Sequence, residues 1–215
     1  MTDETPFSLE SFLGEKLLTK VGKPEKKTAD LMKGKELVAL YFSASWCPPC
    51  KAFSPVLADF YQKYANDGKL EIVYVSSDKT VEEFDGYYGK MPWLSIPATG
   101  TVSIKRNLAE TFGIMGIPTL VIMTSNGEFV TSSGREQVMK VGKDGNGKTL
   151  IDDWKAMETK PLSEAASSAS AGAGPLMKLL MFFARNPMYI IGLMYTYKFL
   201  VKKFKELSGD DHGEL

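Results

Sequence analysis

The stretch Leu37-Val-Ala-Leu-Tyr-Phe-Ser-Ala-Ser-Trp-Cys-Pro-Pro-Cys-Lys51 decides the fold, because an unbroken apolar run leads directly into both cysteines of the 215-residue chain. The run Leu37–Phe42 is typical of a central strand that is covered on both faces of a sheet. A helix should follow, since apolar side chains then recur at the spacing of one helix face: Phe53, Val56, Leu57, Phe60, Tyr61 and Tyr64. A second apolar run, Ile72–Val75, predicts a parallel strand reached by a right-handed crossover.

The next segments extend this strand–helix–strand unit. A further helix is expected over Val81–Lys90. Two apolar runs, Thr119–Met123 and Glu128–Thr131, flank Ser125-Asn-Gly127, and Asn-Gly between such runs is a strong hairpin signal. The order of elements therefore predicts an α/β fold with a mixed central sheet and helices on both faces.

The end of this region is expected to close the domain. Asp144–Gly147 reads as a loop, because glycine alternates there with short polar residues. A last helix is expected near Leu150–Met157, with Trp154 buried in the core.

The two cysteines form a Cys-x-x-Cys pair where the predicted helix begins after the first strand. A helix N-terminus carries unpaired N–H groups and a partial positive charge, which favour the thiolate of Cys47. We expect Cys47 to attack a disulfide and Cys50, one turn later, to resolve the mixed disulfide. Pro48 and Pro49 should stiffen the loop between them.

Composition limits the alternatives. A half zinc or iron–sulfur site would need ligands from another chain, since the sequence offers only one histidine, His212, besides the two cysteines. Two inert core cysteines are the other alternative. The 26 basic and 26 acidic side chains cancel, which argues against a general nucleic-acid-binding role. We therefore expect no metal, no cofactor and no nucleic-acid partner.

Three motifs together resemble the tryparedoxin and nucleoredoxin group of thioredoxin-fold proteins. They are Tyr41–Cys50, Lys90-Met-Pro-Trp-Leu94 and Gly116-Ile-Pro-Thr-Leu120. The resemblance covers about residues 35 to 155 and implies a thioredoxin-like three-layer fold and a protein-disulfide reductase. It places Trp46 beside the cysteine pair, and Met91–Trp93 either at the rim of the site or packed under a loop.

The resemblance also implies a cis peptide bond between Ile117 and Pro118, with the backbone of Ile117 facing the cysteines and pairing with a bound substrate chain. Without the resemblance, Pro118 could equally be a strand-edge proline. Tyr41 stands where thioredoxins carry a buried aspartate, so the proton acceptor for Cys50 must lie elsewhere or be water. Asp78 is either a proton shuttle or a helix N-cap.

The implied partners are disulfide-containing proteins, with peroxiredoxins among the candidates, and an upstream dithiol or reductase that restores the pair. The start of the chain, Met1–Pro6, is acidic and lacks an apolar run, so we expect no secretory signal peptide. The soluble domain should then face the cytosol.

Composition divides the chain into four segments. Residues 1–160 read as the thioredoxin-like domain, and 161–174 as a flexible Ala/Ser/Gly linker. Residues 175–207 are predicted to form a hydrophobic helical segment, and 208–215 a polar tail. The hydrophobic segment is expected to anchor the protein to an intracellular membrane. The alternatives are an interfacial segment or a helix that docks on a protein, which would leave a soluble cytoplasmic protein.

Overall fold

A six-stranded mixed sheet forms the centre of the computed structural model, which describes residues 7–65, 67–99 and 101–166. Three neighbouring strands at one edge of the sheet run parallel to one another. The other three strands each pair antiparallel with the strand before them, beginning at the central strand Leu37–Ser43. The strand order is β5 (Leu94–Ser95), β4 (Leu70–Ser76), β3 (Leu37–Ser43), β6 (Thr119–Thr124), β7 (Glu128–Thr131) and β8 (Lys160–Pro161). The prediction of a mixed sheet is confirmed.

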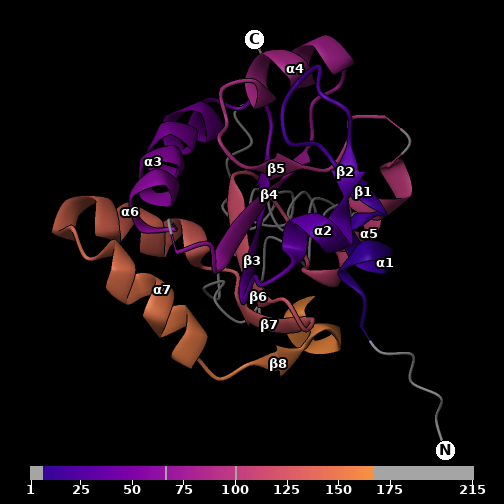
Figure 1. Cartoon of the computed structure of the whole chain (residues 1–215). Helices are drawn as coiled ribbons and strands as arrows, with labels where there is room; N and C mark the ends of the chain where they lie inside the picture. The colour runs from indigo at the N-terminus through magenta and orange to yellow at the C-terminus, as the bar shows by residue number, and fades with distance from the viewer. Residues whose placement is uncertain (1–6, 66, 100, 167–215) are drawn as a thin grey trace, which may run out of the picture. The chain divides into compact units, whose positions relative to one another are not determined.

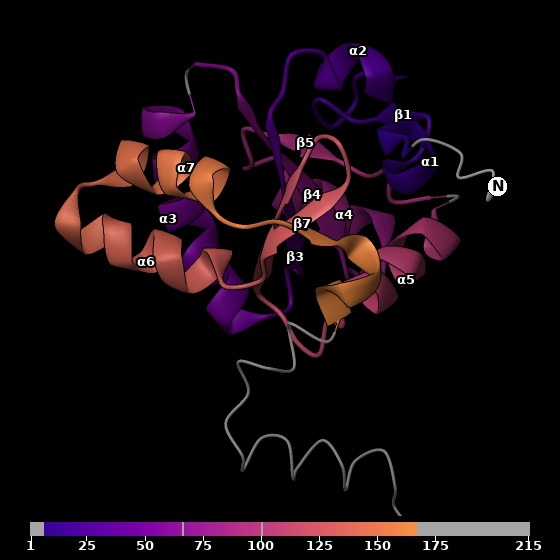
Figure 2. The same cartoon turned by 90° about the horizontal axis from the view of Figure 1, so that it is seen from below.

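Helices cover both faces of this sheet, as Figures 1 and 2 show, so the predicted three-layer arrangement is confirmed. One buried cluster packs the first face against α3 (Pro48–Tyr64), α4 (Val81–Tyr88), α6 (Gly134–Asp144) and α7 (Gly147–Ala156). The other packs the second face against α1 (Leu9–Leu13), α2 (Thr28–Met32) and α5 (Val102–Thr111). A two-stranded hairpin, β1 (Lys16–Leu17) and β2 (Lys26–Lys27), lies outside the main sheet.

The two central strands are buried along their whole length, as the unbroken apolar runs predicted. Every residue of β3 and β4 is buried, and the strands pair in parallel. Tyr41 belongs to the α3 side of the core, whereas its neighbours Leu40 and Phe42 belong to the α5 side. The chain passes from the end of β3 at Ser43 to the start of α3 at Pro48 within a few residues, and the cysteines lie there.

The predicted hairpin is also confirmed. Strands β6 and β7 pair antiparallel across Ser125–Gly127, and Gly127 has a φ of 85°. Glycine adopts this left-handed region without the steric cost that a side chain would bring. Trp154 is buried in α7, as expected.

Two predictions near the end of the domain are right only in part. The loop predicted for Asp144–Gly147 is confined to Gly145 and Asn146, because α6 ends at Asp144 and α7 begins at Gly147. The flexible linker predicted for 161–174 starts too early. Lys160–Pro161 pair with β7, a 3-10 helix covers Leu162–Glu164, and Ala165 is fully buried. Ala166 also packs closely against the domain, next to Gly113. A Cβ on Gly113 would come within 3.2 Å of Ala166.

The predicted hydrophobic helical segment, residues 175–207, lies outside the described residues, as does the polar tail 208–215. Within the described ranges, none of the helices has both the length and the apolar character needed to cross a membrane.

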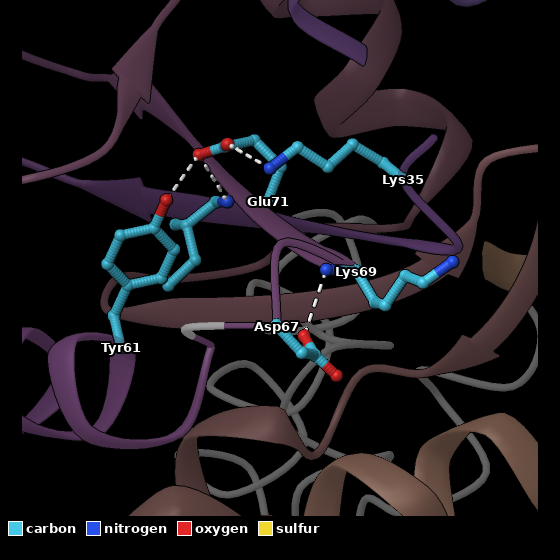
Figure 3. A network of polar contacts seen from close by, with 6 residues as sticks. Lys35, Tyr61, Asp67, Lys69 and Glu71 are labelled. Atoms are coloured by element: carbon cyan, nitrogen blue, oxygen red, sulfur yellow. Dashed lines mark hydrogen bonds and ion pairs between the residues drawn. The ribbon is translucent and has the colours of Figure 1, made fainter. Parts of the chain in front are cut away.

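A buried ion pair at the start of β4 stabilises the end of the sheet remote from the cysteines (Figure 3). One oxygen of Glu71 lies 3.0 Å from Nζ of Lys35. Its other oxygen accepts hydrogen bonds from the Tyr61 hydroxyl at 2.9 Å and the backbone N–H of Ile72 at 3.1 Å. Burial and the nearby carboxylate raise the pKa of Tyr61, so this hydroxyl stays protonated and donates.

We expect Lys35→Met to lower the free energy of unfolding by about 3 kcal/mol, because it leaves the Glu71 carboxylate buried without its cation. Tyr61→Phe should cost only about 1 kcal/mol, since the ion pair remains. Urea denaturation of the two variants measures both values. A Lys35→Met variant as stable as the parent chain would contradict a stabilising role for this pair.

Candidate active site

The cysteine pair lies where α3 begins. Cys47 is the N-cap of the helix, and its sulfur accepts the backbone N–H of Cys50 at 3.3 Å. The two residues form a disulfide with their Cα atoms 5.2 Å apart. Pro48 and Pro49 occupy the first helical positions, where a missing N–H costs no hydrogen bond. The helix N-terminus therefore directs one backbone N–H, that of Cys50, at the sulfur of Cys47.

The two cysteines differ in exposure. Cys47 retains 5% of its surface, whereas Cys50 has 0%. Of the two, only Cys47 therefore offers any surface to an incoming disulfide.

A backbone carbonyl faces the reactive sulfur. The Ile117–Pro118 peptide bond is cis, which confirms that expectation, and Pro118 is buried just before β6. The carbonyl oxygen of Ile117 lies 3.7 Å from Sγ of Cys47. The bonds that Ile117 would form with a bound substrate chain stay a prediction.

Trp46 forms the exposed side of the site. Its indole N–H donates to the carbonyl of Ser77 at 3.0 Å, which fixes the edge of the ring at the end of β4. The side chain is nevertheless 50% exposed. A fixed but exposed aromatic ring beside the cysteines is well suited to contact a partner.

Asp78 ties the cysteine loop to the end of β4. Its Oδ1 accepts the backbone N–H of Ser45 at 2.6 Å. Its Oδ2 accepts the hydroxyls of Tyr74 at 2.6 Å and Ser76 at 2.7 Å. The helix N-cap alternative is wrong, because Thr80 caps α4. The proton-shuttle alternative stays a prediction.

A cluster of four hydroxyl groups lies behind Cys50, on the side of Tyr41. Ser54 bonds to Tyr41 at 2.8 Å and to Tyr87 at 2.6 Å, and it donates to the Cys50 carbonyl at 3.0 Å. Ser43 joins Tyr41 at 3.0 Å and Tyr87 at 3.2 Å. Burial raises the pKa of Tyr41, so its hydroxyl stays neutral and can pass a proton on but not hold a charge.

Trp93 is packed in the core and does not lie at the rim of the site. Of the two placements expected for it, the packed one is therefore correct. Its side chain is 1% exposed, and it packs edge-on against Tyr41 at 5.9 Å and Tyr61 at 6.0 Å. Met91 is also buried. Trp93 therefore supports the ring of Tyr41 from inside the core.

Comparison with known proteins agrees with this geometry. The family model described as thioredoxin-like matches residues 34–129. Tryparedoxin from Trypanosoma brucei brucei is 43% identical over 104 residues, which are 48% of this chain and 72% of that protein. The chain belongs to the thioredoxin-like family, in its tryparedoxin and nucleoredoxin group. This tryparedoxin-like chain is thus a thiol-disulfide oxidoreductase with a redox-active cysteine pair.

Other relatives agree with this placement. Human nucleoredoxin is also 43% identical, over 103 residues, but the match covers 47% of the tryparedoxin-like chain and only 23% of nucleoredoxin. The solved tryparedoxin from Trypanosoma brucei superposes with a TM-score of 0.58 and 37% identity, over 68% of this chain and 96% of that one. A tryparedoxin II solved as a complex with glutathionylspermidine gives 0.58 and 35%, over 64% and 95%.

The fold brings the predicted site residues of the tryparedoxin-like chain together from three segments. Trp46, Cys47 and the two prolines come from the start of α3 and the two residues before it, Ile117 and Pro118 lie just before β6, and Asp78 lies just after β4. The hydroxyls of Ser43, Ser54 and Tyr87 were missed by the sequence analysis. Tyr41 at the position of the thioredoxin aspartate was the one signal that a different polar group must stand behind Cys50.

Proposed function

We propose that the protein is a protein-disulfide reductase in which Cys47 is the nucleophile and Cys50 the resolving thiol. The observation that carries this proposal is the difference between the two sulfurs. Cys47 keeps 5% of its surface accessible and caps the helix N-terminus, while Cys50 is fully enclosed one turn further on. A thiolate is the attacking species in disulfide exchange, so the accessible sulfur at the positive helix end is the one suited to attack.

The reaction starts from the dithiol form. The Cys47 thiolate attacks one sulfur of the target disulfide, so that a new S–S bond forms while the target bond breaks and releases a thiolate. Cys50 then loses its proton and attacks the sulfur of Cys47, which frees the second target thiolate. Two electrons have moved to the target, which takes up two protons to become a dithiol. A second, external dithiol reduces the Cys47–Cys50 disulfide again.

The surrounding residues position these groups. Trp46 offers its exposed ring to the target protein, and the backbone of Ile117, set by Pro118, pairs with the target chain beside Cys47. Pro48 and Pro49 hold the two cysteines at disulfide distance. Asp78 holds the loop before Trp46, which makes it a positioning residue.

The proposed targets are disulfide-containing proteins, with peroxiredoxins among them. The proposed donor is an upstream dithiol or a reductase. A tryparedoxin II has been solved in complex with glutathionylspermidine, which supports a donor of low molecular mass. The steps above need no further cofactor, because the two cysteines carry both electrons.

Alkylation of the reduced protein tests the assigned roles. Iodoacetamide should modify Cys47 well before Cys50, and its rate should become half-maximal below about pH 8.5, the value for a free cysteine. Peptide mapping by mass spectrometry identifies the modified sulfur. Two thiols that both react as slowly as free cysteine would contradict the proposal.

A nucleoredoxin-like binding module is the second candidate. It is favoured by the 43% identity to human nucleoredoxin, equal to the value for tryparedoxin. In that case the redox state of Cys47 and Cys50 would gate contact with a signalling partner. Such a module would bind its partner in one redox state only and would show no turnover of insulin disulfides with dithiothreitol.

We also propose that the segment 175–207 attaches the protein to an intracellular membrane, with the domain facing the cytosol. Its apolar residues carry basic flanks, which suit a membrane interface. Deleting 175–215 should move the protein from the membrane pellet to the supernatant in high salt. Deleting only 208–215 is the matched control and should leave it in the pellet. Full-length protein in the supernatant would contradict membrane attachment.

A further inference from the structure

A cavity of about 560 Å³ lies between helices α3 and α4. It reaches from Ser45, two residues before Cys47, along Ser54 of α3 to Tyr87 and Met91. Its volume falls within the range of cavities that hold small molecules. Neither Ile117 nor Cys47 lines it.

A glycine and a proline, both unusual inside a helix, line this cavity. Gly86 lies inside α4, where glycine is destabilising relative to alanine. A Cβ at Gly86 would meet nothing within 4 Å, so packing does not require a glycine there. Pro55 lies inside α3 on the facing wall and cannot donate a hydrogen bond to the carbonyl of Lys51.

The two acidic residues of the cavity already serve the N-terminus of α4. Oε2 of Glu83 accepts the backbone N–H of Lys79 at 3.0 Å, and the N–H of Glu83 donates to Thr80 at 3.2 Å. Hydrogen bonds from its own backbone N–H and from Thr80 lower the pKa of Glu82. Both carboxylates therefore stabilise the positive N-terminus of α4, and we do not assign them to the binding of a cationic ligand.

The two basic residues of the cavity have no such partner. Lys51 on α3 and Lys90 after α4 line it and are exposed. Within the part of the chain that the structure describes, neither takes part in an ion pair. These two lysines are therefore the lining charges that remain available to an anionic group of a ligand.

The floor of the cavity is both apolar and hydrogen-bonding. Ser54 and Tyr87 line it, and their hydroxyls share a bond of 2.6 Å. The ring of Tyr87 is 7% exposed, and Pro55, Ala58 and Met91 add apolar surface. A ligand with an apolar or aromatic body could rest here while an anionic group meets the lysines.

We propose that this cavity binds a small carboxylate with an apolar or aromatic body. The carboxylate lies between Lys51 and Lys90, and the body contacts Tyr87 and the space above Gly86. The inference goes beyond the reductase function, because disulfide exchange at Cys47 requires no ligand between α3 and α4.

Three matched probes test the charge preference: phenylacetate, the neutral phenylacetamide and the cationic phenethylammonium. Each is titrated into the full-length oxidised chain labelled with ¹⁵N. Phenylacetate should give saturable amide shifts at Ser54, Gly86 and Tyr87, with an affinity at least about tenfold above that of the other two probes, since only it gains two charge contacts. Equal binding of all three probes, or shifts confined to other residues, overturns the proposal.

Two variants place the ligand. Lys51→Gln combined with Lys90→Gln should weaken phenylacetate binding about tenfold, as expected for the loss of two exposed charge contacts. Lys63→Gln, also on α3 but outside the cavity, is the matched control and should bind as the parent does. Gly86→Leu should fold, because its side chain enters open space, and should block the probe. Unchanged binding in both cavity variants overturns the proposal.

Discussion

Replacing Cys47 with serine should reduce the turnover of insulin disulfides to the background rate of dithiothreitol alone. Cys50 is fully enclosed, so no second sulfur can take over the attack. A serine hydroxyl at the same helix end is not ionised near neutral pH and does not exchange with disulfides. The measurement is the rate of insulin precipitation with limiting protein and excess dithiothreitol.

Replacing Cys50 with serine should give a different result. The attack by Cys47 remains possible, but the mixed disulfide can no longer be resolved from within the protein. The variant should therefore accumulate covalent complexes that a reducing gel releases. Identifying the trapped proteins from cells would report the targets directly.

Both variants need a folded reference, because they also lose the Cys47–Cys50 disulfide. The dithiol form of the parent protein is that reference, and its urea midpoint should match those of the variants. Turnover by Cys47→Ser above background would contradict the role of Cys47. An absence of trapped complexes in Cys50→Ser would contradict the role of Cys50.

The sequence could predict the parts of this site that are encoded locally. The cysteine loop lies between an apolar run and a helical pattern, and the hairpin has its Asn-Gly turn. These elements formed as predicted because a few adjacent residues decide each of them. The cis bond before Pro118 followed instead from the resemblance of Gly116–Leu120 to a known group.

The rest depends on contacts between distant segments. Helix α5 buries only Leu108 fully, and α6 has a glycine, Gly142, within it, so neither shows a strong helical pattern. The hydroxyl cluster joins Ser43, Ser54 and Tyr87 from three elements. Ala165 looked like a linker residue, yet its small size lets the chain pack closely against the domain.

Asp78→Ala should be the most destabilising single change near the site. It removes the acceptor for the Ser45 backbone N–H and for the hydroxyls of Tyr74 and Ser76, all partly buried. Leaving such donors unpaired costs about 1–3 kcal/mol each, so a total loss of about 3 kcal/mol is expected even if water reaches some of them. Urea denaturation of the oxidised protein measures it.

Asp59→Ala is the matched control, because Asp59 lies on α3 and forms only an exposed pair with Lys63. Its loss should cost less than about 0.5 kcal/mol. An Asp78→Ala variant as stable as Asp59→Ala would show that the three hydrogen bonds to Asp78 do not hold the cysteine loop.

Asp78→Asn separates positioning from proton transfer. The asparagine keeps one acceptor oxygen of similar shape but cannot take up a proton at neutral pH. Because three donors already occupy the carboxylate oxygens, we expect the decay of a preformed mixed disulfide to keep the pH profile of the parent, with only a modest loss of rate. A profile that loses its pH dependence would instead assign the proton of Cys50 to Asp78, and the neutral hydroxyl of Tyr41 would then serve only to pack and position the turn that carries Cys50.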